Sequence, residues 1–358
     1  MHSLMLTDSK VPREWLSIME DLRVGDIVFV LGASDTGKTT LIKFLINECV
    51  KKGKRIAFVD SDIGQTSIGL PTTISSSVFS SIEDLKSPKI NSLFFIGSTS
   101  PHGNLLQMAV GVKKTTESVL RQRPEVVVID TTGFVHGPAA TELKYQKISL
   151  VQPSHVIAIQ REAELEPLLR LLSNSFESLR IIRLNPSLDV RARSFEERLA
   201  NRERRFARYF SRSSILKIEL GNVSLRRGYF GGGLPISSSR LYEISKIFGA
   251  DFLYGEEGKD EALFIVRSPG YIPALVSKVQ GFIQKSSIRI VPLGDLEGVI
   301  VGLGNKGGFV LGLGIFSGME EGVISILTPL RDVSRVKTIT FGTLKLEPSG
   351  KEVGKLSY

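Results

Sequence analysis

A lysine and a threonine close a glycine-rich segment, “GASDTGKT”, at residues 32–39. The spacing matches the P-loop pattern G-x-x-x-x-G-K-[ST], in which backbone N–H groups surround the phosphates of a nucleotide. A lysine at position 38 reaches the β- and γ-phosphates, and a hydroxyl at position 39 is a ligand of Mg²⁺. The start of the following helix adds partial positive charge. The pattern predicts a nucleotide-phosphate site made of Gly32, Ala33, Ser34, Asp35, Thr36, Gly37, Lys38, Thr39 and Thr40.

Acidic side chains follow two of the apolar segments of the chain. “VDSDIGQ” places Asp60 and Asp62 after one segment, and “VVVID” ends another at Asp130. The carboxyl ends of parallel strands face the ligand crevice of an α/β sheet, where an aspartate can hold Mg²⁺ or accept a proton from an attacking hydroxyl. We therefore expect Thr39, Asp60, Asp62 and Asp130 to be metal ligands, with Asp60 or Asp62 as the base. Capping of turns or helices is the alternative for each aspartate.

Further along, “RSFEERLANRERRFARYF” concentrates arginines from Arg193 onward. Ser194 and Glu197 have the spacing of a capping box, which predicts a helix over about 195–210. The helical period gives this helix one apolar stripe, formed by Phe195, Leu199, Phe206 and Phe210. Arg198 and Arg202 lie one turn apart beside the stripe, so both can reach a single phosphoryl group and donate bidentately to its oxygens. Contact with a nucleic-acid backbone, or a salt-bridged surface, is the alternative.

The chain carries a formal net charge of +9 over 358 residues. Positive charge favours a polyanionic partner, because neutralised phosphates release their counterions. Four other arginines in and around the predicted helix fit this guiding role better than catalysis: Arg191, Arg193, Arg204 and Arg208. Charge that serves only solubility is the alternative.

Short apolar runs alternate with helical patterns in the first part of the chain. The expected strands cover residues 26–32, 55–62, 92–97, 125–130, 155–160 and 179–186. The expected helices cover residues 38–52, 104–123, 138–150 and 162–173. Runs rich in Val, Ile and Phe are typical of strands buried on both faces. The alternation predicts an α/β fold with a mostly parallel, doubly wound sheet over about residues 23–212, after a short N-terminal segment, 1–22.

Residues 213–358 have a different character. Short strand-like runs are separated by Gly, Pro or Asp turns, which predicts a smaller β-rich C-terminal domain. “GLGNKG” at residues 302–307 matches the dinucleotide fingerprint G-x-G-x-x-G, but a strand-like run follows where that fingerprint needs a helix. We expect these glycines to form β-turns.

Several classes of protein are disfavoured. No window reaches the roughly 18 consecutive apolar residues of a membrane span, and the first residues lack a signal-peptide pattern. The single cysteine, Cys49, excludes an internal disulfide. We therefore expect a cytoplasmic protein without membrane association. The guanine-reading segment Asn-Lys-x-Asp follows none of the predicted strands, which disfavours a GTPase.

Five segments occur in an order that resembles a known family: “GASDTGKTT”, “DSDIGQTSIGLPTTI”, “IGSTSPHGN”, “DTTGFVHG” and the arginine helix. Over about residues 25–210 the chain resembles the polynucleotide 5′-hydroxyl kinases, P-loop RNA kinases of tRNA and mRNA 3′-end processing and of rRNA processing. The compact length and the “SIGLPTTI” continuation look most like the archaeal members.

The resemblance implies roles for particular residues. The D-x-D-x-G-Q segment makes Asp62 the base for the 5′-hydroxyl and adds Gln65 to the nucleotide site. R-x-x-x-R makes Arg198 and Arg202 a catalytic lid that acts with Lys38. Two further segments are implied to bind the substrate through Ser98, Thr99, Pro101, Thr131, Thr132, Gly133 and Phe134. The family frequently has a base-stacking tryptophan where this chain has Phe134, and phenylalanine can also stack.

Together the residues and the resemblance predict ATP-dependent transfer of the γ-phosphate to 5′-hydroxyl ends of RNA, with DNA as an alternative substrate. The cofactors are ATP and Mg²⁺, with other divalent ions as alternatives. Protein partners in RNA processing are also implied. An ATP-bound scaffold with little catalysis, or a small-molecule P-loop kinase, is the competing function.

Overall fold

The chain divides into two units, Met1–Arg202 and Glu203–Tyr358. The computed structural model describes residue 4 and residues 12–186, 191–267, 272–320 and 322–357. The division falls within helix α7 (Phe195–Phe210), earlier than the expected boundary after residue 212.

A mostly parallel sheet forms the centre of the first unit. Its strands are β1 (Asp26–Gly32), β2 (Ile56–Ser61), β3 (Thr73–Phe79), β4 (Ser92–Phe95), β5 (Val126–Thr131), β6 (His155–Ile159) and β7 (Arg180–Leu184). They lie in the order β4-β3-β2-β5-β1-β6-β7. The pairings of β2 with β5, β5 with β1, β1 with β6 and β6 with β7 are parallel, whereas β3 pairs antiparallel with both β2 and β4. The carboxyl ends of β1, β2 and β5 therefore meet at one edge.

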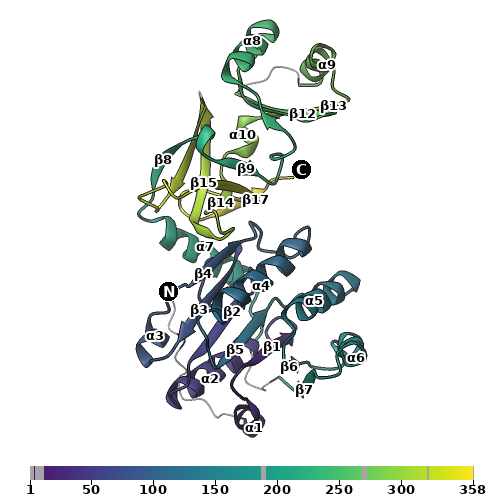
Figure 1. Ribbon diagram of the computed structural model, residues 1–358, viewed down its shortest axis with the longest axis vertical. Helices are drawn as coiled ribbons and strands as arrows, with labels where there is room; N and C mark the ends of the chain where they lie inside the picture. The colour runs from purple at the N-terminus through teal and green to yellow at the C-terminus, as the bar shows by residue number, and fades with distance from the viewer. Residues whose placement is uncertain (1–3, 5–11, 187–190, 268–271, 321, 358) are drawn as a thin grey trace. The chain divides into compact units, whose positions relative to one another are not determined.

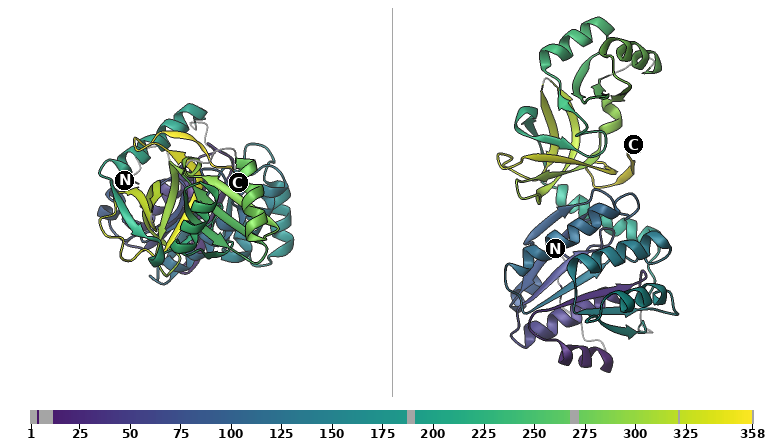
Figure 2. Two further views of the ribbon diagram at one scale, coloured as in Figure 1. Left: turned by 90° about the horizontal axis from the view of Figure 1, so that it is seen from above. Right: turned by 45° about the vertical axis from the view of Figure 1, so that its right-hand side comes forward.

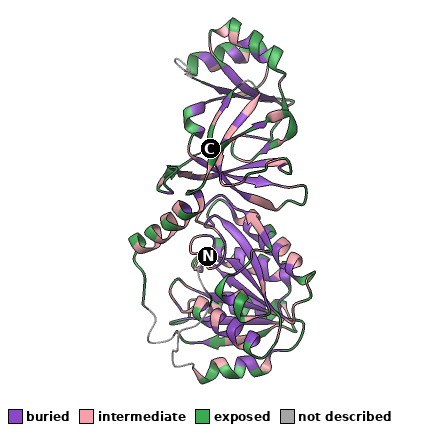
Figure 3. Cartoon of the chain, turned by 90° about the vertical axis from the view of Figure 1, so that its left-hand side faces the viewer, coloured by how far each residue is buried: buried purple, intermediate pink, exposed green. Residues whose placement is uncertain are grey.

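Helices cover both faces of this sheet (Figures 1 and 2). They are α1 (Arg13–Asp21), α2 (Lys38–Lys51), α3 (Ile82–Lys86), α4 (Leu105–Leu120), α5 (Pro138–Val151) and α6 (Glu166–Ser175). Successive strand residues point to opposite faces: Val28 packs with α1 and α2, whereas Phe29 packs with α4, α5 and α6. This layering confirms the expected α/β class. Figure 3 shows the strands as mainly buried.

Two features of this unit were not predicted from the sequence. Strand β3, “TISSSVF”, has too many serines to read as a buried strand, yet Ser75, Ser76 and Ser77 are all buried. The neighbouring strand β4 provides one hydrogen-bond partner, because the Ser76 and Ser92 hydroxyls are 2.6 Å apart. The N-terminal segment contains α1, whose Trp15 lies 5.6 Å from the ring of Phe44 and packs against the core.

The second unit is β-rich, as expected. Its strands are β8 (Ser214–Glu219), β9 (Ser224–Arg226), β10 (Leu234–Pro235), β11 (Phe252–Glu257), β12 (Glu261–Val266), β13 (Ser287–Pro292), β14 (Val299–Gly304), β15 (Val310–Glu320), β16 (Val323–Thr328), β17 (Thr338–Leu346) and β18 (Glu352–Lys355). Strands β10–β13 form one sheet and the others a second sheet. Helices α8 (Ser238–Phe248) and α9 (Ile272–Ile283) pack against the smaller sheet and were not expected. The expectation that the glycines of “GLGNKG” form β-turns is only partly confirmed: Gly302 and Gly304 lie in β14, and Gly307 lies in the turn between β14 and β15.

Helix α7 begins and ends where the sequence predicts. Its capping box is present: the Ser194 hydroxyl accepts from the Glu197 N–H, and the Glu197 carboxylate accepts from the Ser194 N–H. The predicted apolar stripe is buried only in its second half. Phe206 and Phe210 are buried, but Phe195 is 68% exposed, so its expected packing role is wrong. Every helix within the described residues is too short or too polar to cross a bilayer.

Candidate active site

The P-loop joins β1 to α2 and has the conformation that phosphate binding needs. Gly37 caps α2 with φ 92°, a left-handed value that favours glycine. At Gly32, a Cβ atom would lie 2.5 Å from the Thr36 hydroxyl oxygen and 2.8 Å from the Ile159 carbonyl oxygen. Both glycines are therefore required by the tight path of the backbone.

Two side chains of this loop are already directed into it. The Lys38 amine, only 6% exposed, donates to the Ala33 carbonyl at 2.7 Å. The Thr39 hydroxyl donates to the Asp130 carboxylate at 3.2 Å. The loop thus holds a cation against its own backbone, and it pairs a hydroxyl with the aspartate at the end of β5. Both side chains thus lie at the loop, and their roles toward phosphate and metal stay predictions.

Asp60 and Asp130 lie side by side on β2 and β5. Asp60 accepts hydrogen bonds from the N–H groups of Ser67 and Ile68 at one carboxylate oxygen and from Asp62 N–H at the other. Burial and the charge of Asp130 raise the pKa of Asp60 to about 7. Burial also raises the pKa of Asp130 to about 6, although Lys38 opposes this. Asp60 therefore organises the loop after β2 and has little freedom to meet a substrate.

Asp62 lies beyond the end of β2 and is only partly buried. One of its carboxylate oxygens accepts from the N–H groups of Gly64, at 3.1 Å, and Gln65, at 3.0 Å. Its other oxygen accepts no hydrogen bond from the part of the chain that the structure describes. The carboxylate is thus held by one oxygen with the other available, which is the geometry a general base needs. Spacing left Asp60 and Asp62 as alternatives, and this contact pattern favours Asp62.

The segments expected to bind substrate lie next to each other. A Cβ at Gly64 would lie 3.0 Å from the Thr99 carbonyl oxygen, so the loop after β2 lies against segment 97–101. The rings of His102 and Phe134 are 4.6 Å apart, which joins that segment to the turn after β5. His102 is exposed and was not anticipated. The pair offers a larger stacking surface than Phe134 alone.

The end of β5 and the turn after it require one correction, which concerns Thr131, the last residue of the strand. Thr131 is fully buried, and its hydroxyl donates to the Val30 carbonyl at 2.9 Å, so its side chain ties β5 to β1 and cannot reach a substrate. Thr132, Ser98 and Pro101 are also largely buried. A Cβ at Gly133 would lie 2.5 Å from the Ser34 nitrogen, so this turn packs directly on the P-loop.

The start of α7 contacts the P-loop through Asp35. The Arg198 guanidinium donates to the Asp35 carboxylate at 2.7 Å, and the Arg193 N–H donates to the same oxygen. Arg161 donates to the Asp35 carbonyl. Gln65 donates to the Arg198 carbonyl at 3.2 Å, so it contacts the lid helix. Arg202 follows one turn along α7 and is partly buried. Arg198, which is predicted to be a lid arginine, thus contacts the P-loop.

The sequence interpretation missed two lysines on α5. Lys144 and Lys147 are both completely buried. The Lys144 amine donates to the Thr132 carbonyl at 2.7 Å, and the Lys147 amine lies 3.5 Å from the Ser61 hydroxyl. A signal was present, because these lysines fall on the periodic core positions of α5: Ala140, Leu143, Lys144, Lys147, Ile148 and Val151. A charged residue on a core stripe suggests a buried polar contact.

The residues expected to bind metal offer oxygen ligands suited to Mg²⁺. No group of three or more acidic, histidine or cysteine side chains in the described residues is arranged to hold an ion by itself. Mg²⁺ usually takes one or two carboxylates and completes its shell with water and substrate phosphates. The Thr39–Asp130 pair at the P-loop fits that mode.

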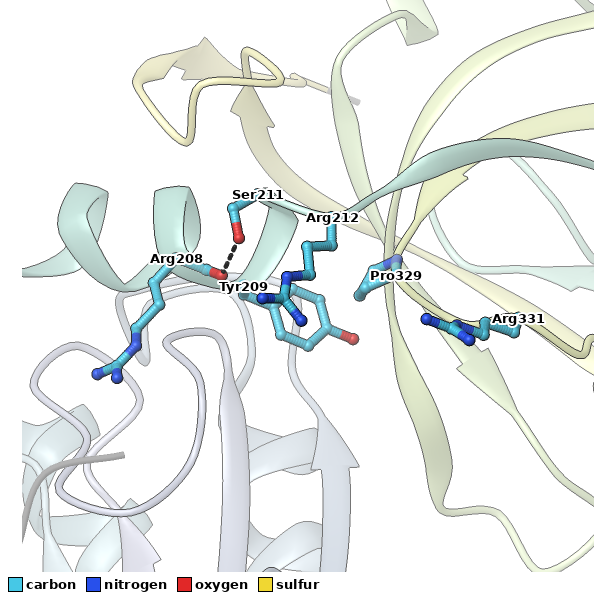
Figure 4. Close-up of a pocket in the computed structure, with 6 residues that line it drawn as sticks. All are labelled: Arg208, Tyr209, Ser211, Arg212, Pro329 and Arg331. Carbon is cyan, nitrogen blue, oxygen red and sulfur yellow. Dashed lines mark hydrogen bonds between the residues drawn. The ribbon is translucent and has the colours of Figure 1, made fainter.

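A separate basic pocket lies within the second unit. It has a volume of about 420 Å³ and is lined by Arg208, Tyr209, Ser211, Arg212, Pro329 and Arg331. Figure 4 shows Arg331 extending toward the Tyr209 hydroxyl and Arg212. None of its arginines forms an ion pair with a residue that the structure describes. The pocket therefore retains its positive charge.

Comparison with known proteins assigns the family. Residues 32–212 match the family described as mRNA cleavage and polyadenylation factor CLP1 P-loop. The chain is 33% identical to a polyribonucleotide 5′-hydroxyl-kinase of Pyrococcus horikoshii over 92% of this chain and 88% of that protein. The chain belongs to the CLP1 P-loop family. A polyribonucleotide 5′-hydroxyl-kinase of Thermococcus kodakarensis is 32% identical over 97% of this chain and 96% of its own length.

Solved CLP1 structures share the fold. A wild-type Clp1p–Pcf11p complex contains a chain that matches 93% of this one and is itself covered over 77%, with a TM-score of 0.60 and 13% identity. At that identity the likeness supports the fold alone. The CLP1 P-loop match ends at residue 212, whereas the archaeal relatives align through most of the β-rich unit as well.

Proposed function

We propose that this chain is an ATP-dependent polynucleotide 5′-hydroxyl kinase that acts on RNA. The archaeal relatives carry the name polyribonucleotide 5′-hydroxyl-kinase and align over almost the whole chain. The observation that carries the proposal is the carboxylate of Asp62, held by two N–H groups and open at its other oxygen, at the sheet edge where the P-loop begins.

The proposed reaction needs one proton acceptor. The 5′-hydroxyl oxygen attacks the γ-phosphorus, its proton passes to the free oxygen of Asp62, and the bond from the γ-phosphorus to the bridging oxygen breaks to release ADP. A fixed carboxylate accelerates this step by orientation. Asp60 supports it by holding the loop that contains Gly64 and Gln65.

Three cations act on the transferred group. Lys38 exchanges its Ala33 carbonyl contact for phosphate oxygens, while Arg198 leaves Asp35 to join Arg202 at the γ-phosphoryl. Charge on the moving phosphoryl group is thereby stabilised by prearranged donors. Thr39 and Asp130 would hold Mg²⁺, which would supply neutralisation of the charge on the nucleotide phosphates. Asp60 and Asp62 would add negative charge to the same site.

The terminal nucleotide binds beside Asp62. Segment 97–101 and the turn after β5 flank it, and its base stacks on Phe134 with His102 alongside. Stacking tolerates any base, because each base has a π face. DNA remains the alternative substrate, and a cytoplasmic location and protein partners in RNA processing remain predictions.

The test is transfer of labelled γ-phosphate from ATP to a 5′-hydroxyl oligoribonucleotide with Mg²⁺ across a broad temperature range. We expect a labelled 5′ end, and none on a matched oligonucleotide that already carries a 5′-phosphate. ATP that stays bound without transfer in the presence of RNA would instead support the scaffold function.

A further inference from the structure

The buried lysines of α5 have a role that packing does not explain. Both side chains are 0% exposed. Removing an amine from water costs free energy unless its hydrogen bonds are replaced, and buried lysines are rare for that reason. A helix that needed only to cover a sheet would carry Leu or Met at these positions. The contacts made by the two amines must therefore account for them.

Lys144 fixes the orientation of one peptide group. Its amine donates to the Thr132 carbonyl at 2.7 Å and lies 3.4 Å from the Thr132 hydroxyl. In a trans peptide the C=O and the following N–H point in opposite directions. Holding this carbonyl toward α5 therefore turns the Gly133 N–H away from α5. Gly133 packs on Ser34 of the P-loop, so Lys144 sets the direction of a donor beside the phosphate site.

Lys147 acts where two strands end. Its amine lies 3.5 Å from the Ser61 hydroxyl, which itself donates to the Asp130 carbonyl at 2.5 Å. Ser61 stands between Asp60 and Asp62. Burial lowers the pKa of the Lys147 amine to about 7, although the charges of Asp62 and Asp130 oppose this. Lys147 thus contacts the Ser61 hydroxyl, and the hydrogen bond from that hydroxyl to the Asp130 carbonyl joins the carboxyl ends of β2 and β5.

We propose that Lys144 and Lys147 are positioning residues for phosphoryl transfer, which anchor the ends of β5 and β2 to α5 and so hold the Gly133 N–H and the Asp62 carboxylate in register with the P-loop. The proposal rests on the kinase function proposed above. Neither amine is exposed to substrate, so each acts through the group it contacts: Thr132 for Lys144 and Ser61 for Lys147.

The first experiment replaces each lysine by methionine, which keeps the length and removes the amine. We expect kcat to fall by about 10–100-fold, as for other supporting residues, with KM for ATP within about twofold. The midpoint of thermal unfolding should stay unchanged or rise, because a buried amine is lost. Gln146→Met, at an exposed position of the same helix, is the matched control. A lowered midpoint with unchanged kcat would show that the lysines are merely structural.

The second experiment separates positioning from a general loss of stability. If Lys147 acts through Ser61, kcat of the Ser61→Ala/Lys147→Met double variant should match that of Lys147→Met within about twofold. Multiplied losses would overturn the proposal. All rates are measured well below the lowest unfolding midpoint, so that every variant is folded. Ser61→Ala alone keeps the lysine and provides a second variant if a methionine variant does not fold.

A third measurement does not depend on kinase activity. Hydrogen exchange of segments 61–64 and 131–134 is followed in the nucleotide-free protein. We expect exchange at least about tenfold faster in Lys144→Met and Lys147→Met than in Gln146→Met, since the local openings become easier. Unchanged exchange would overturn the positioning role. A wild-type chain that shows the exchange difference but transfers no phosphate would overturn only the proposed function.

Discussion

Positive charge is placed in two contrasting ways in the two units. In the first unit, Lys38, Lys144 and Lys147 are at most 6% exposed, and each contacts a defined oxygen of the backbone or of a hydroxyl. In the second unit, the arginines of the basic pocket are exposed, and none forms an ion pair with a described residue. One set is fixed in position, and the other is free to adapt to a ligand.

The contrast has an energetic origin. A buried amine loses its hydration, so it persists only where precise contacts compensate, and its removal changes those contacts directly. An exposed guanidinium keeps its water and is screened by salt, so one arginine contributes little. We therefore expect single substitutions in the buried set to change turnover strongly, whereas the exposed set should matter only collectively and at low salt.

The largest effect should come from Lys38→Ala. This substitution removes the amine that moves from the Ala33 carbonyl to the phosphates, so phosphate transfer should fall below detection. The measurement is the initial rate of labelled phosphate transfer to a 5′-hydroxyl oligoribonucleotide. Lys52→Ala, at the exposed end of the same helix, is the control and should keep the wild-type rate. A similar loss in both variants would remove the distinction between buried and exposed cations.

Arg202→Ala should have the next largest effect. It tests a cation between the two sets, because Arg202 is neither buried nor fully exposed. We expect kcat to fall by about 10²–10³, as when one prearranged donor is lost. ATP affinity, measured by calorimetry, should change far less, since the lid acts on the moving phosphoryl group. Arg204→Ala, an exposed neighbour on the same helix, is the control. Equal losses in turnover and ATP affinity would argue against a lid role.

The sequence predicts those features that local pattern determines. The P-loop, the strands around it and α7 with its capping box all depend on neighbouring residues, and each lies where it is expected. Strand β3 was not predicted, because its buried serines resemble a loop until Ser92 of β4 lies opposite Ser76. The distinction between Asp60 and Asp62 likewise needed the N–H groups of the folded loop.

The α5 lysines show a different limit of sequence interpretation. A lysine on a helix normally indicates solvent, so two lysines on the core stripe did not suggest a site. Their partners are Ser61 and the Thr132 carbonyl, which the sheet brings beside α5 from earlier in the chain. Tertiary contacts, and not helical periodicity, therefore determine what these amines do.

The stability of Lys147→Met relative to wild type should depend on pH. The amine has an ordinary pKa of 10.5 and a folded-state pKa of about 7. Below pH 7 both states are protonated, and the wild type bears the whole cost of the buried charge. Between about pH 7 and 10.5 the unfolded chain holds a proton that the folded chain lacks, so wild-type stability rises with pH.

The advantage of the methionine variant should therefore be largest below pH 7 and shrink toward pH 10.5, by about 5 kcal/mol. Urea unfolding of metal-free protein at several pH values measures it. Lys52→Ala is again the control and should show a constant difference. An advantage that grew with pH would mean that the folded protein stabilises the protonated form of Lys147. The contrast between costly buried cations and inexpensive exposed cations would then be wrong.

The smallest effect should come from the basic pocket. We expect an Arg212→Ala/Arg331→Ala variant to bind a long single strand a few-fold more weakly at low salt while turnover on a short oligonucleotide is unchanged. Each lost phosphate contact lowers the slope of log affinity against log salt by about 0.7. The double variant should therefore lose about 1.4 in slope if both arginines contact phosphate.

Removing two exposed arginines from the first unit, in Arg121→Ala/Arg170→Ala, changes the net charge equally and serves as the control. An equal loss of slope in both double variants would mean that net charge alone attracts the strand. A loss confined to the pocket variant would mean that Arg212 and Arg331 meet phosphates directly. In that case the exposed arginines also make defined contacts, and they differ from the buried lysines only in the smaller free energy of each contact.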